Sequence, residues 1–302
     1  MNSRTSRTQM LYTLGFVFFL ICAFAAFFTG VKVGADKTEA KYSHLIEADG
    51  ASEEFSGSYQ QQDLVTFYHN VFLPYREFKR NWNKEVDSLS RSTDARENAA
   101  TLKNLSILAD KQYEKVNQDS IFSGSPLLYQ SQLNILKSLT LFSQASNKVS
   151  AGSSGTETAK ALKNDNFTAS AMQFGLLAQK DFYDSMLKWG SKTNSKIPAV
   201  PSELKTLSFI QWKKMPLLLK NASIAEMMLN RGIYAGYDPQ DITAKIDDMI
   251  YSGMASSLKL QDVQSSVTLL ISTGAIQEQD FMKWREQYYG KETMPQLPFF
   301  YE

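Results

Sequence analysis

The first pattern along the chain is an uninterrupted apolar run near the N-terminus. Residues 11–28 read LYTLGFVFFLICAFAAFF and contain no charged side chain. With their neighbours they form a stretch at 11–31 of about 20 residues, the length that an α-helix needs to cross the hydrocarbon core of a bilayer. No polar face interrupts the run, so a helix buried in a globular core is a poor alternative. The sequence therefore predicts a single-pass transmembrane helix at residues 11–31, preceded by a short tail at 1–10.

Two other fates of this segment stay open. A cleaved secretory signal has a shorter apolar core of about 7–15 residues, yet Val33-Gly34-Ala35 offers a small-residue cleavage site. Lipidation at Cys22, the single cysteine, is disfavoured because the bulky Ile21 stands where a lipoprotein signal has a small residue. We favour a retained signal-anchor.

Charges on the two sides of the span bear on its orientation. Arg4 and Arg7 precede the span, whereas Lys32, Lys37 and Lys41 follow it, so a count of basic residues nearly balances. We favour the N-terminus inside because a short Arg-bearing tail before a first apolar segment is typical of a signal-anchor. This orientation predicts a protein of the cell membrane with an extracytoplasmic body.

Beyond the span the pattern becomes polar and then helical. Residues 36–62 are rich in Gly, Ser, Glu and Gln and predict a flexible stalk. From Asp63, apolar side chains recur at steps of three and four residues, which is the spacing of one helix face. Pro74 interrupts this stripe and should kink the helix or mark its true start. The stripe consists of Leu64, Phe67, Val71, Tyr75, Phe78, Trp82, Val86 and Leu89.

Three more amphipathic helices follow the first one. Their predicted starts are Asp94, with Glu97 completing a capping box, Ser125 before Pro126, and a position near Phe167 after a flexible turn at 151–155. The fourth helix is expected to end at Gly190. Four helices within residues 63–190, joined by short polar turns, predict an up-down bundle. Strand-like alternation is absent throughout, so the expected fold class is all-α.

The C-terminal third has shorter periodic segments. Residues 191–201 (SKTNSKIPAVP) predict a linker, and the region 202–302 then holds five short helices that either pack on the bundle or form a small separate domain. The predicted segments run from Ser202 to Met215, Pro216 to Gly232, Asp238 to Gly253, Asp262 to Gly274 and Gln277 to Gly290. The tail PQLPFFYE is apolar enough that it should dock on the protein or on a partner.

Composition narrows the function classes. The chain has 32 Lys and Arg against 31 Asp and Glu, a net charge of +1, so nothing in its charge balance indicates a nucleic-acid partner. Hydrophobic residues make up 43% of the chain, which is ordinary for a globular protein with a real core. The body has no cysteine, so it holds no disulfide and no cysteine-based metal site.

The search for catalytic motifs finds none, so we predict a protein that is not an enzyme and has no cofactor, metal or catalytic residue. The two histidines, His44 and His69, have no partner at metal-ligand spacing and are expected at the surface. Asp247 and Asp248 are adjacent on a helix, diverge by about 100°, and are expected to be solvated. The segment 238–241 lacks the glycine and the bidentate glutamate of a calcium loop, so Asp238 is expected to cap a helix.

Two other groups of side chains have both a functional and a structural interpretation. Arg76, Lys79, Arg80 and Lys84 form a basic stripe on the first helix, and Lys213-Lys214 follows Trp212. Such groups can contact anionic lipid or a wall polymer, but an ordinary solvated face explains them better. Phe67, Phe72, Phe78 and Trp82 could line a ligand pocket, but a packed core is the favoured interpretation.

Residues 258–290 contain a local motif. An apolar helix stops at Gly274, Ile276 follows, and an acidic restart at Asp280 precedes Phe281 and Lys283. This resembles the short C-terminal helical hairpin called SHOCT, although Gln277 stands where that family usually has Thr as cap. The resemblance implies a helical hairpin associated with oligomerisation.

Together these patterns predict a membrane-anchored helical interaction or scaffold protein of a bacterial cell envelope. The bilayer would be contacted through residues 11–31, and the body would bind a protein partner or a second copy. The rival hypothesis is an extracytoplasmic ligand-sensing or ligand-binding helical bundle. A closed apolar core favours the scaffold, whereas a pocket lined by convergent polar groups favours the ligand binder.

Overall fold

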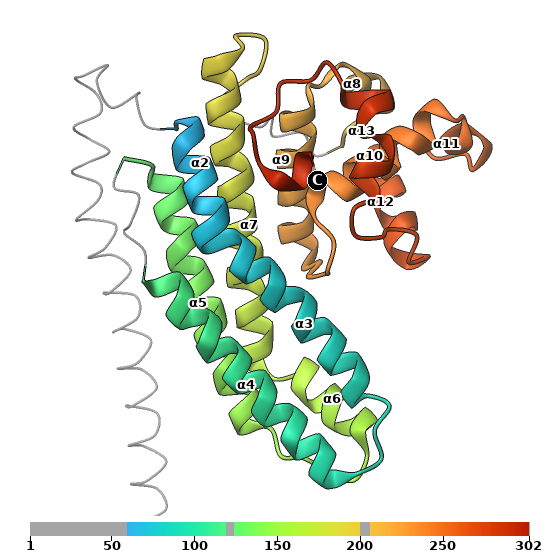
Figure 1. Cartoon of the computed structure of the whole chain (residues 1–302). Helices are drawn as coiled ribbons and strands as arrows, with labels where there is room; N and C mark the ends of the chain where they lie inside the picture. The colour runs from blue at the N-terminus through green and yellow to red at the C-terminus, as the bar shows by residue number, and fades with distance from the viewer. Residues whose placement is uncertain (1–58, 119–123, 200–205, 302) are drawn as a thin grey trace, which may run out of the picture. The chain divides into compact units, whose positions relative to one another are not determined.

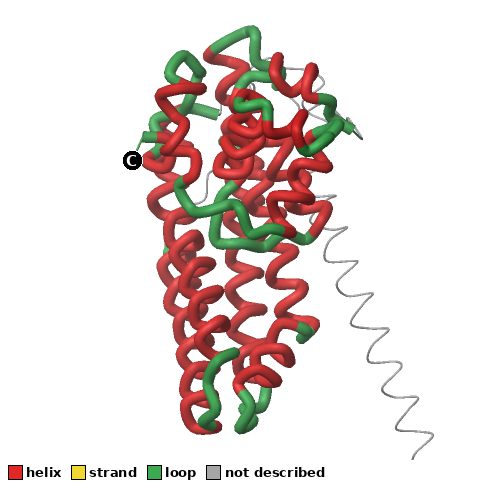
Figure 2. The backbone as a smooth tube through the Cα atoms, turned by 90° about the vertical axis from the view of Figure 1, so that its right-hand side faces the viewer, coloured by secondary structure: helices red, strands yellow, loops and turns green. Residues whose placement is uncertain are grey.

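The computed structural model of the chain describes residues 59–118, 124–199 and 206–301. The predicted tail, the anchor at 11–31, His44 and most of the stalk lie outside these residues. Within the described part, no helix combines the length and hydropathy needed to cross a membrane. Its elements are all helices, as Figure 2 shows, so the all-α fold class is confirmed for this part of the chain.

The first long helix is interrupted near Pro74 in a way that the sequence did not specify. It comprises α2 (Gln61–Phe67), a π-helical turn η3 (Tyr68–Phe72) and α3 (Leu73–Leu89). The backbone N–H of Leu73 donates to the carbonyl of Tyr68, five residues earlier. Proline lacks an N–H and crowds the carbonyl four residues before it, and a π turn widens the helix at that point. The helical course therefore continues through Pro74.

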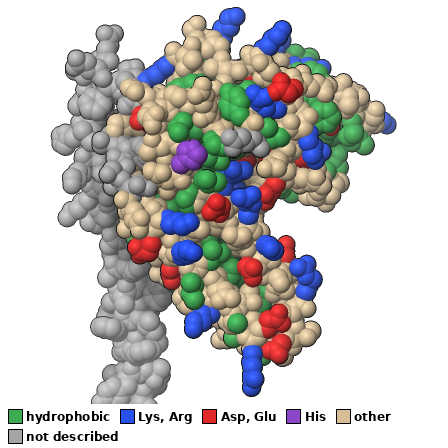
Figure 3. Space-filling model, viewed as in Figure 1, with side chains coloured by type: hydrophobic (Ala, Val, Ile, Leu, Met, Phe, Trp, Pro, Cys, Tyr) green, Lys and Arg blue, Asp and Glu red, His purple; other side chains and the backbone are tan. Residues whose placement is uncertain are grey.

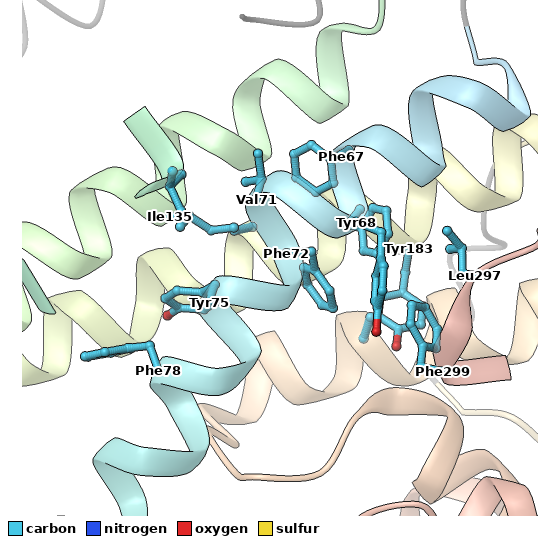
Figure 4. Close-up of a cluster of buried hydrophobic side chains, with 14 of the residues drawn as sticks. Phe67, Tyr68, Val71, Phe72, Tyr75, Phe78, Ile135, Tyr183, Leu297 and Phe299 are labelled. Atoms are coloured by element: carbon cyan, nitrogen blue, oxygen red, sulfur yellow. The ribbon is translucent and has the colours of Figure 1, made fainter. Parts of the chain in front are cut away.

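The predicted apolar stripe of this helix is the core of the bundle. All eight stripe positions are buried, from Leu64 to Leu89. Their rings pack against those of the other helices: the Phe67 and Phe182 centroids are 5.0 Å apart, and those of Trp82 and Phe142 are 4.3 Å apart. Figure 4 shows part of this aromatic cluster. The expectation that these aromatics form a packed core is confirmed.

Three other bundle helices begin close to their predicted positions, namely α4 (Ala95–Asn117), α5 (Pro126–Lys148) and α7 (Asn166–Thr193). A short helix that was not predicted, α6 (Gly155–Lys163), lies between α5 and α7 in the chain. The carboxylate of Asp94 accepts from the N–H groups of Arg96 and Glu97, which confirms the cap. The predicted capping box is wrong, because the Glu97 carboxylate accepts from the Ser92 hydroxyl and the N–H of Asp94 donates to that same hydroxyl. In Figure 1 the helices α3, α4, α5 and α7 run side by side, with α4 packed on α5 and α5 on α7.

Two glycines have roles that differ from the sequence predictions. Gly155, expected in a flexible turn, begins α6, and a Cβ there would lie 2.0 Å from the Leu89 carbonyl oxygen. Gly190, expected to end the fourth helix, lies inside α7, where a Cβ would be 2.4 Å from a Leu218 methyl. Both glycines are therefore sites of close packing between elements.

The C-terminal region consists of short helices and a docked tail. Its elements are α8 (Phe209–Lys214), α9 (Leu217–Arg231), α10 (Pro239–Tyr251), α11 (Met254–Ser257), α12 (Val263–Ser272), α13 (Asp280–Tyr289) and the 3₁₀ turn η4 (Pro298–Phe300). Gly232, with φ of 64°, ends α9, and Gly274, with φ of 61°, lies just after α12. Both glycines end their helices as predicted.

Two predicted helix starts in this region were misplaced. Ser202 lies outside the described residues, and the helix that ends before Met215 begins only after Ser208, whose hydroxyl caps it together with Gln211. The last helix begins at Asp280, not at Gln277, because Gln279 adopts a left-handed φ of 66° immediately before it. Serine and glutamine are frequent at both caps and turns, so spacing alone did not select the right one.

The short helices pack on the bundle. Contact runs from α7 to α9, from α9 to α10, and from α10 to α13, and residues 58–302 form one compact unit. The apolar tail docks on the same unit, since Leu297 and Phe300 are fully buried. Phe299 packs on Tyr68, Phe182 and Tyr183 at centroid distances of 5.1–6.4 Å, as Figure 4 shows in part. The tail is thus part of the core that joins the two regions.

Candidate functional site

A buried ion cluster joins the first helix to the C-terminal region. An Arg76 Nη lies 2.6 Å from Asp238 Oδ2, and Lys79 Nζ lies 3.5 Å from Asp238 Oδ1. Lys79 also donates to the side-chain oxygen of Gln179 on α7 and to the carbonyl of Tyr237. Two members of the predicted basic stripe are therefore not solvated, which corrects that expectation. Charge on the first helix is matched by a carboxylate about 160 residues away in sequence.

The electrostatics of the cluster follow from burial and pairing. Burial by itself would raise the pKa of Asp238, but Arg76 and Lys79 outweigh it and hold that pKa below its ordinary value. Burial lowers the pKa of Lys79, and the nearby Arg76 charge adds to this effect. Asp238 therefore remains a carboxylate, and it is the counter-ion that holds Arg76 and Lys79 of the first helix against the C-terminal region.

Asp241 connects two helix starts next to this cluster. Its Oδ2 accepts from the N–H of Asp238, which completes a capping box on α10, and its Oδ1 accepts from the N–H of Phe281 on α13. The cap predicted at Asp238 is confirmed. Through its second oxygen, Asp241 also accepts from a backbone N–H at the start of α13. Burial and the charge of Asp238 raise the pKa of Asp241 to about 7.

An open cleft of about 330 Å³ lies beside these groups. We call it the junction cleft, because its walls come from η3 and α3 on one side and from α10, α13 and η4 on the other. Figure 3 shows hydrophobic and cationic side chains together on the face that carries the histidine of the described part. The lining residues are Tyr68, His69, Leu73, Arg76, Arg80, Gln240, Asp241, Gln279, Phe281, Met282, Pro298 and Phe299.

Arg76 is a fixed wall of the junction cleft. Its guanidinium is held by Asp238, donates to the hydroxyl of Tyr68 at 3.2 Å, and lies 5.6 Å from the centroid of the Phe299 ring. A cation that is paired on one side and stacked on an aromatic ring on the other is pre-organised at little entropic cost. Arg76 therefore positions the tail and does not need a ligand.

Arg80 and His69 are the more accessible polar groups at the rim. Arg80 forms an ion pair with Glu278 at 3.4 Å, with both side chains more than 40% exposed. A pair this exposed contributes little to stability, so an incoming anion can replace Glu278. His69 is exposed, as expected, and its ring lies edge-on to Tyr68 at 5.2 Å. The cleft thus combines apolar walls at Phe281, Phe299 and Met282 with a rim where Arg80 can pair with an anion.

A second buried charge network lies in the C-terminal region, and none of its members lines this cleft. Asp247 Oδ2 lies 2.9 Å from Lys220 Nζ, and its carboxylate also accepts from Trp212 Nε1 at 2.7 Å and from the Tyr289 hydroxyl at 2.6 Å. Asp247 is fully buried, which corrects the expectation of a solvated pair, whereas Asp248 is partly exposed. Every contact of Asp247 is a structural tie between α8, α9, α10 and α13.

Sequence reasoning did not find the junction cleft because its walls come from four separate stretches of chain. The usable signals were an aromatic tail and a basic stripe on an amphipathic helix, but neither indicates which carboxylate pairs with the stripe. Among the described residues, no group of His, Cys, Asp and Glu side chains is placed to hold a metal ion. Comparison with protein-family models, curated proteins and solved structures found no match to this chain.

Proposed function

We propose that this chain is a non-enzymatic interaction protein of the bacterial cell envelope, anchored by residues 11–31, whose body binds a partner protein at the junction cleft. The observation that carries this proposal is the cleft itself, an open, partly apolar concavity between the first helix and the C-terminal region. The bundle core supports a scaffold because its aromatic side chains fill it.

The chemistry of the cleft indicates what part of a partner it would accept. Phe281, Met282 and Phe299 offer an apolar floor for one or two hydrophobic side chains. Arg80 at the rim favours an acidic group beside those side chains. We therefore expect a short partner segment with hydrophobic and acidic residues in succession.

The polar groups of the cleft support binding more than catalysis. Asp241 is engaged by two backbone N–H groups, Gln240 accepts from the Tyr183 hydroxyl, and Arg76 is paired with Asp238. Groups that are saturated by the protein are poor general acids or bases, because catalysis needs an atom within reach of the substrate.

A ligand-binding bundle remains the second candidate, and the size of the cleft favours it. Small-molecule sites span about 300–1,000 Å³, and the cleft lies at the lower end of this range. The same floor and rim would hold a small hydrophobic acid. The two candidates therefore differ in the mass of the occupant and not in the residues used.

Photo-crosslinking in cells would test the partner proposal. A photoreactive phenylalanine analogue at Met282, which lines the cleft, should give an adduct with a protein, whereas the same group at the exposed Ile107 of α4 should not. Arg80→Gln should reduce the adduct, and Lys84→Gln, one turn further along the same helix and exposed, should leave it unchanged.

Several outcomes separate the candidates. Equal adducts from both positions would refute binding at the cleft. A gain of only small-molecule mass at Met282 would select the ligand-binding alternative. Self-crosslinking of the chain would support the oligomerisation that the SHOCT-like hairpin at 258–290 implies.

The proposed topology has its own test. Protease added to intact or wall-stripped cells should degrade the body from residue 63 onward while residues 1–10 stay protected. Protection of the body until the cells are lysed would reverse the orientation. A mature N-terminus at Asp36 would instead identify a cleaved signal.

A further inference from the structure

One end of the C-terminal region exposes a group of large apolar side chains. Ile210 on α8, Tyr251 at the end of α10, Met254 on α11 and Leu258 just after it are 48–71% exposed. Only three other large hydrophobic residues of the described part are comparably exposed, and none lies on these helices. Figure 3 shows hydrophobic side chains gathered where Figure 1 places α11. Exposed groups of this kind mark interaction surfaces.

Backbone and ring contacts bring these residues to one surface. Ser208, just before α8, pairs with Asp262 in an isolated β-bridge, and the Leu207 carbonyl accepts from Val263 at 2.9 Å. Lys213 Nζ lies 5.7 Å from the centroid of the Tyr251 ring, which ties α8 to the end of α10. We call the residues Ile210, Lys213, Lys214, Tyr251, Met254, Leu258 and Lys259 the α8–α11 surface.

An aromatic row extends the α8–α11 surface onto α13. The ring of Tyr251 packs on Tyr288 at 5.0 Å, and Tyr288 stacks on Trp284 at 5.5 Å. Both α13 rings are half-buried. Tyrosine and tryptophan are enriched where a protein meets the headgroup layer, because one part of each ring system is apolar and the other can hydrogen-bond.

Cations surround the apolar part. Lys213, Lys214 and Lys259 are exposed at this surface. The carboxylates near it include those of Asp248, Asp262 and Glu292, and that of Glu292 accepts from the N–H of Leu217 at 3.1 Å. The Asp262 carboxylate is occupied by capping α12, where it accepts from the N–H of Ser265 at 2.7 Å and from its hydroxyl at 2.6 Å. Lysine can lay its aliphatic stem on an apolar surface while its ammonium group reaches lipid phosphates.

We propose that the α8–α11 surface lies on an anionic lipid bilayer. Its apolar side chains would enter the headgroup region while its lysines meet lipid phosphates, the arrangement of an interfacial membrane contact. This inference rests on the proposed membrane attachment through residues 11–31. A second copy of the chain is a poorer occupant, because a two-fold contact would place the same lysines opposite one another.

The test uses the full chain reconstituted in lipid vesicles. Cys22→Ser provides a background without cysteine, in which Leu258→Cys carries an environment-sensitive fluorophore. Ile107→Cys is the matched control, since Leu258 and Ile107 are 50% and 52% exposed. In vesicles that contain phosphatidylglycerol and spin-labelled lipid, the label at 258 should shift to the blue and be quenched, and the label at 107 should show neither effect. The combination Lys213→Gln, Lys214→Gln and Lys259→Gln should abolish the quenching.

The remaining outcomes overturn the inference in distinguishable ways. Failure of the chain to float with vesicles refutes the membrane attachment and the surface together. Flotation without quenching at 258, or with equal quenching at 107, refutes the surface alone. Quenching that persists in purely zwitterionic vesicles or in the triple lysine variant refutes the anionic-lipid contact. Fluorophore self-quenching at 258 that disappears when the chain is diluted among vesicles would assign the surface to a second copy. Circular dichroism of each variant verifies that it is folded.

Discussion

The bundle and the C-terminal region hold their helices together by different means. In the bundle, residues 59–193, long helices bury mainly aliphatic, aromatic and uncharged polar side chains, with Lys79 and Asp184 as buried charged residues. In the C-terminal region, residues 206–301, no described helix exceeds 15 residues, and Lys220, Asp238, Asp241, Asp247 and Asp280 are buried. Short helices offer less apolar face and more unpaired ends for each residue.

The difference shows what buried charge does in this protein. Asp241 and Asp280 accept from backbone N–H groups at the start of α13 or just before it, and Asp247 ties together side chains from three other elements. Asp241 and Asp280 therefore satisfy backbone donors that short helices leave open, whereas Asp247 satisfies buried side-chain donors. The bundle needs few such ties because its interfaces are long enough to pack by apolar contact.

The largest effect is expected in the C-terminal region, from Asp247→Ala. This change leaves the Lys220 ammonium buried without its counter-ion and strands two further donors, so the free energy of unfolding should fall by about 4–6 kcal/mol. Urea unfolding of the full chain in mild detergent, followed by circular dichroism, measures it. Asp248→Ala on the same helix is the control and should change stability by less than about 0.5 kcal/mol.

The double variant Lys220→Met, Asp247→Leu sharpens this test. Replacing both charges with apolar side chains removes the uncompensated ion, so the double variant should be more stable than Asp247→Ala. A double variant that is as unstable as the single one would mean that volume matters at this site and charge does not.

Next in size is the bundle variant Trp82→Ala. Trp82 is 1% exposed and packs on Phe142, so its removal should cost about 3–5 kcal/mol. The same unfolding measurement applies, with Ile107→Ala as the exposed bundle control. A loss below about 0.5 kcal/mol would remove Trp82 from the core and contradict the described register.

Phe299→Ala tests the contact between the two regions. Phe299 is 8% exposed and packs on the rings of Tyr68 and Phe182. We therefore expect the free energy of unfolding to fall by about 2–4 kcal/mol. Tyr301→Ala, at a residue 43% exposed, is the control. Unchanged melting combined with loss of the Met282 crosslink would instead assign Phe299 to the partner interface alone.

The smallest effect is a pH dependence that compares one acid from each region. The pKa of Asp241 and that of Asp181 on α7 are both raised to about 7, chiefly by burial. In the native state each group retains a proton that the unfolded chain has already lost, so stability falls as pH rises through 7. For one such group the fall between pH 6 and 8 is about 1.4 kcal/mol, less where solvent screens the charge.

Urea unfolding at pH 6 and pH 8 measures this dependence. Asp241→Asn should remove the larger part of the fall, because Asp241 is 2% exposed whereas Asp181 is only partly buried. If Asp181→Asn flattened the curve and Asp241→Asn did not, the titrating acid would belong to the bundle. A rise in stability with pH would contradict both assignments.

Local sequence features predicted much of the bundle and less of the candidate site. The stripe from Leu64 to Leu89, the cap at Asp94 and the glycine stop at Gly232 depend on residues within one helix, and each was read correctly. The short helix α6 was missed because nine residues give too little periodicity to register. The burial of Lys79 and the pairing of Arg76 were missed because nothing near them in sequence supplies their carboxylate.

The sequence alone therefore determined the all-α class of the described part, the inward face of the long helices and most helix ends. These depend on periodicity and capping, which act over three or four residues. Only the tertiary structure decided that Asp238 forms ion pairs with the basic stripe, that Asp247 is buried, and that the tail forms one wall of a cleft. The local sequence around a charged or aromatic residue is the same whether that residue faces water or contacts a residue far away in the chain. The tertiary fold therefore decides which of the two environments it has.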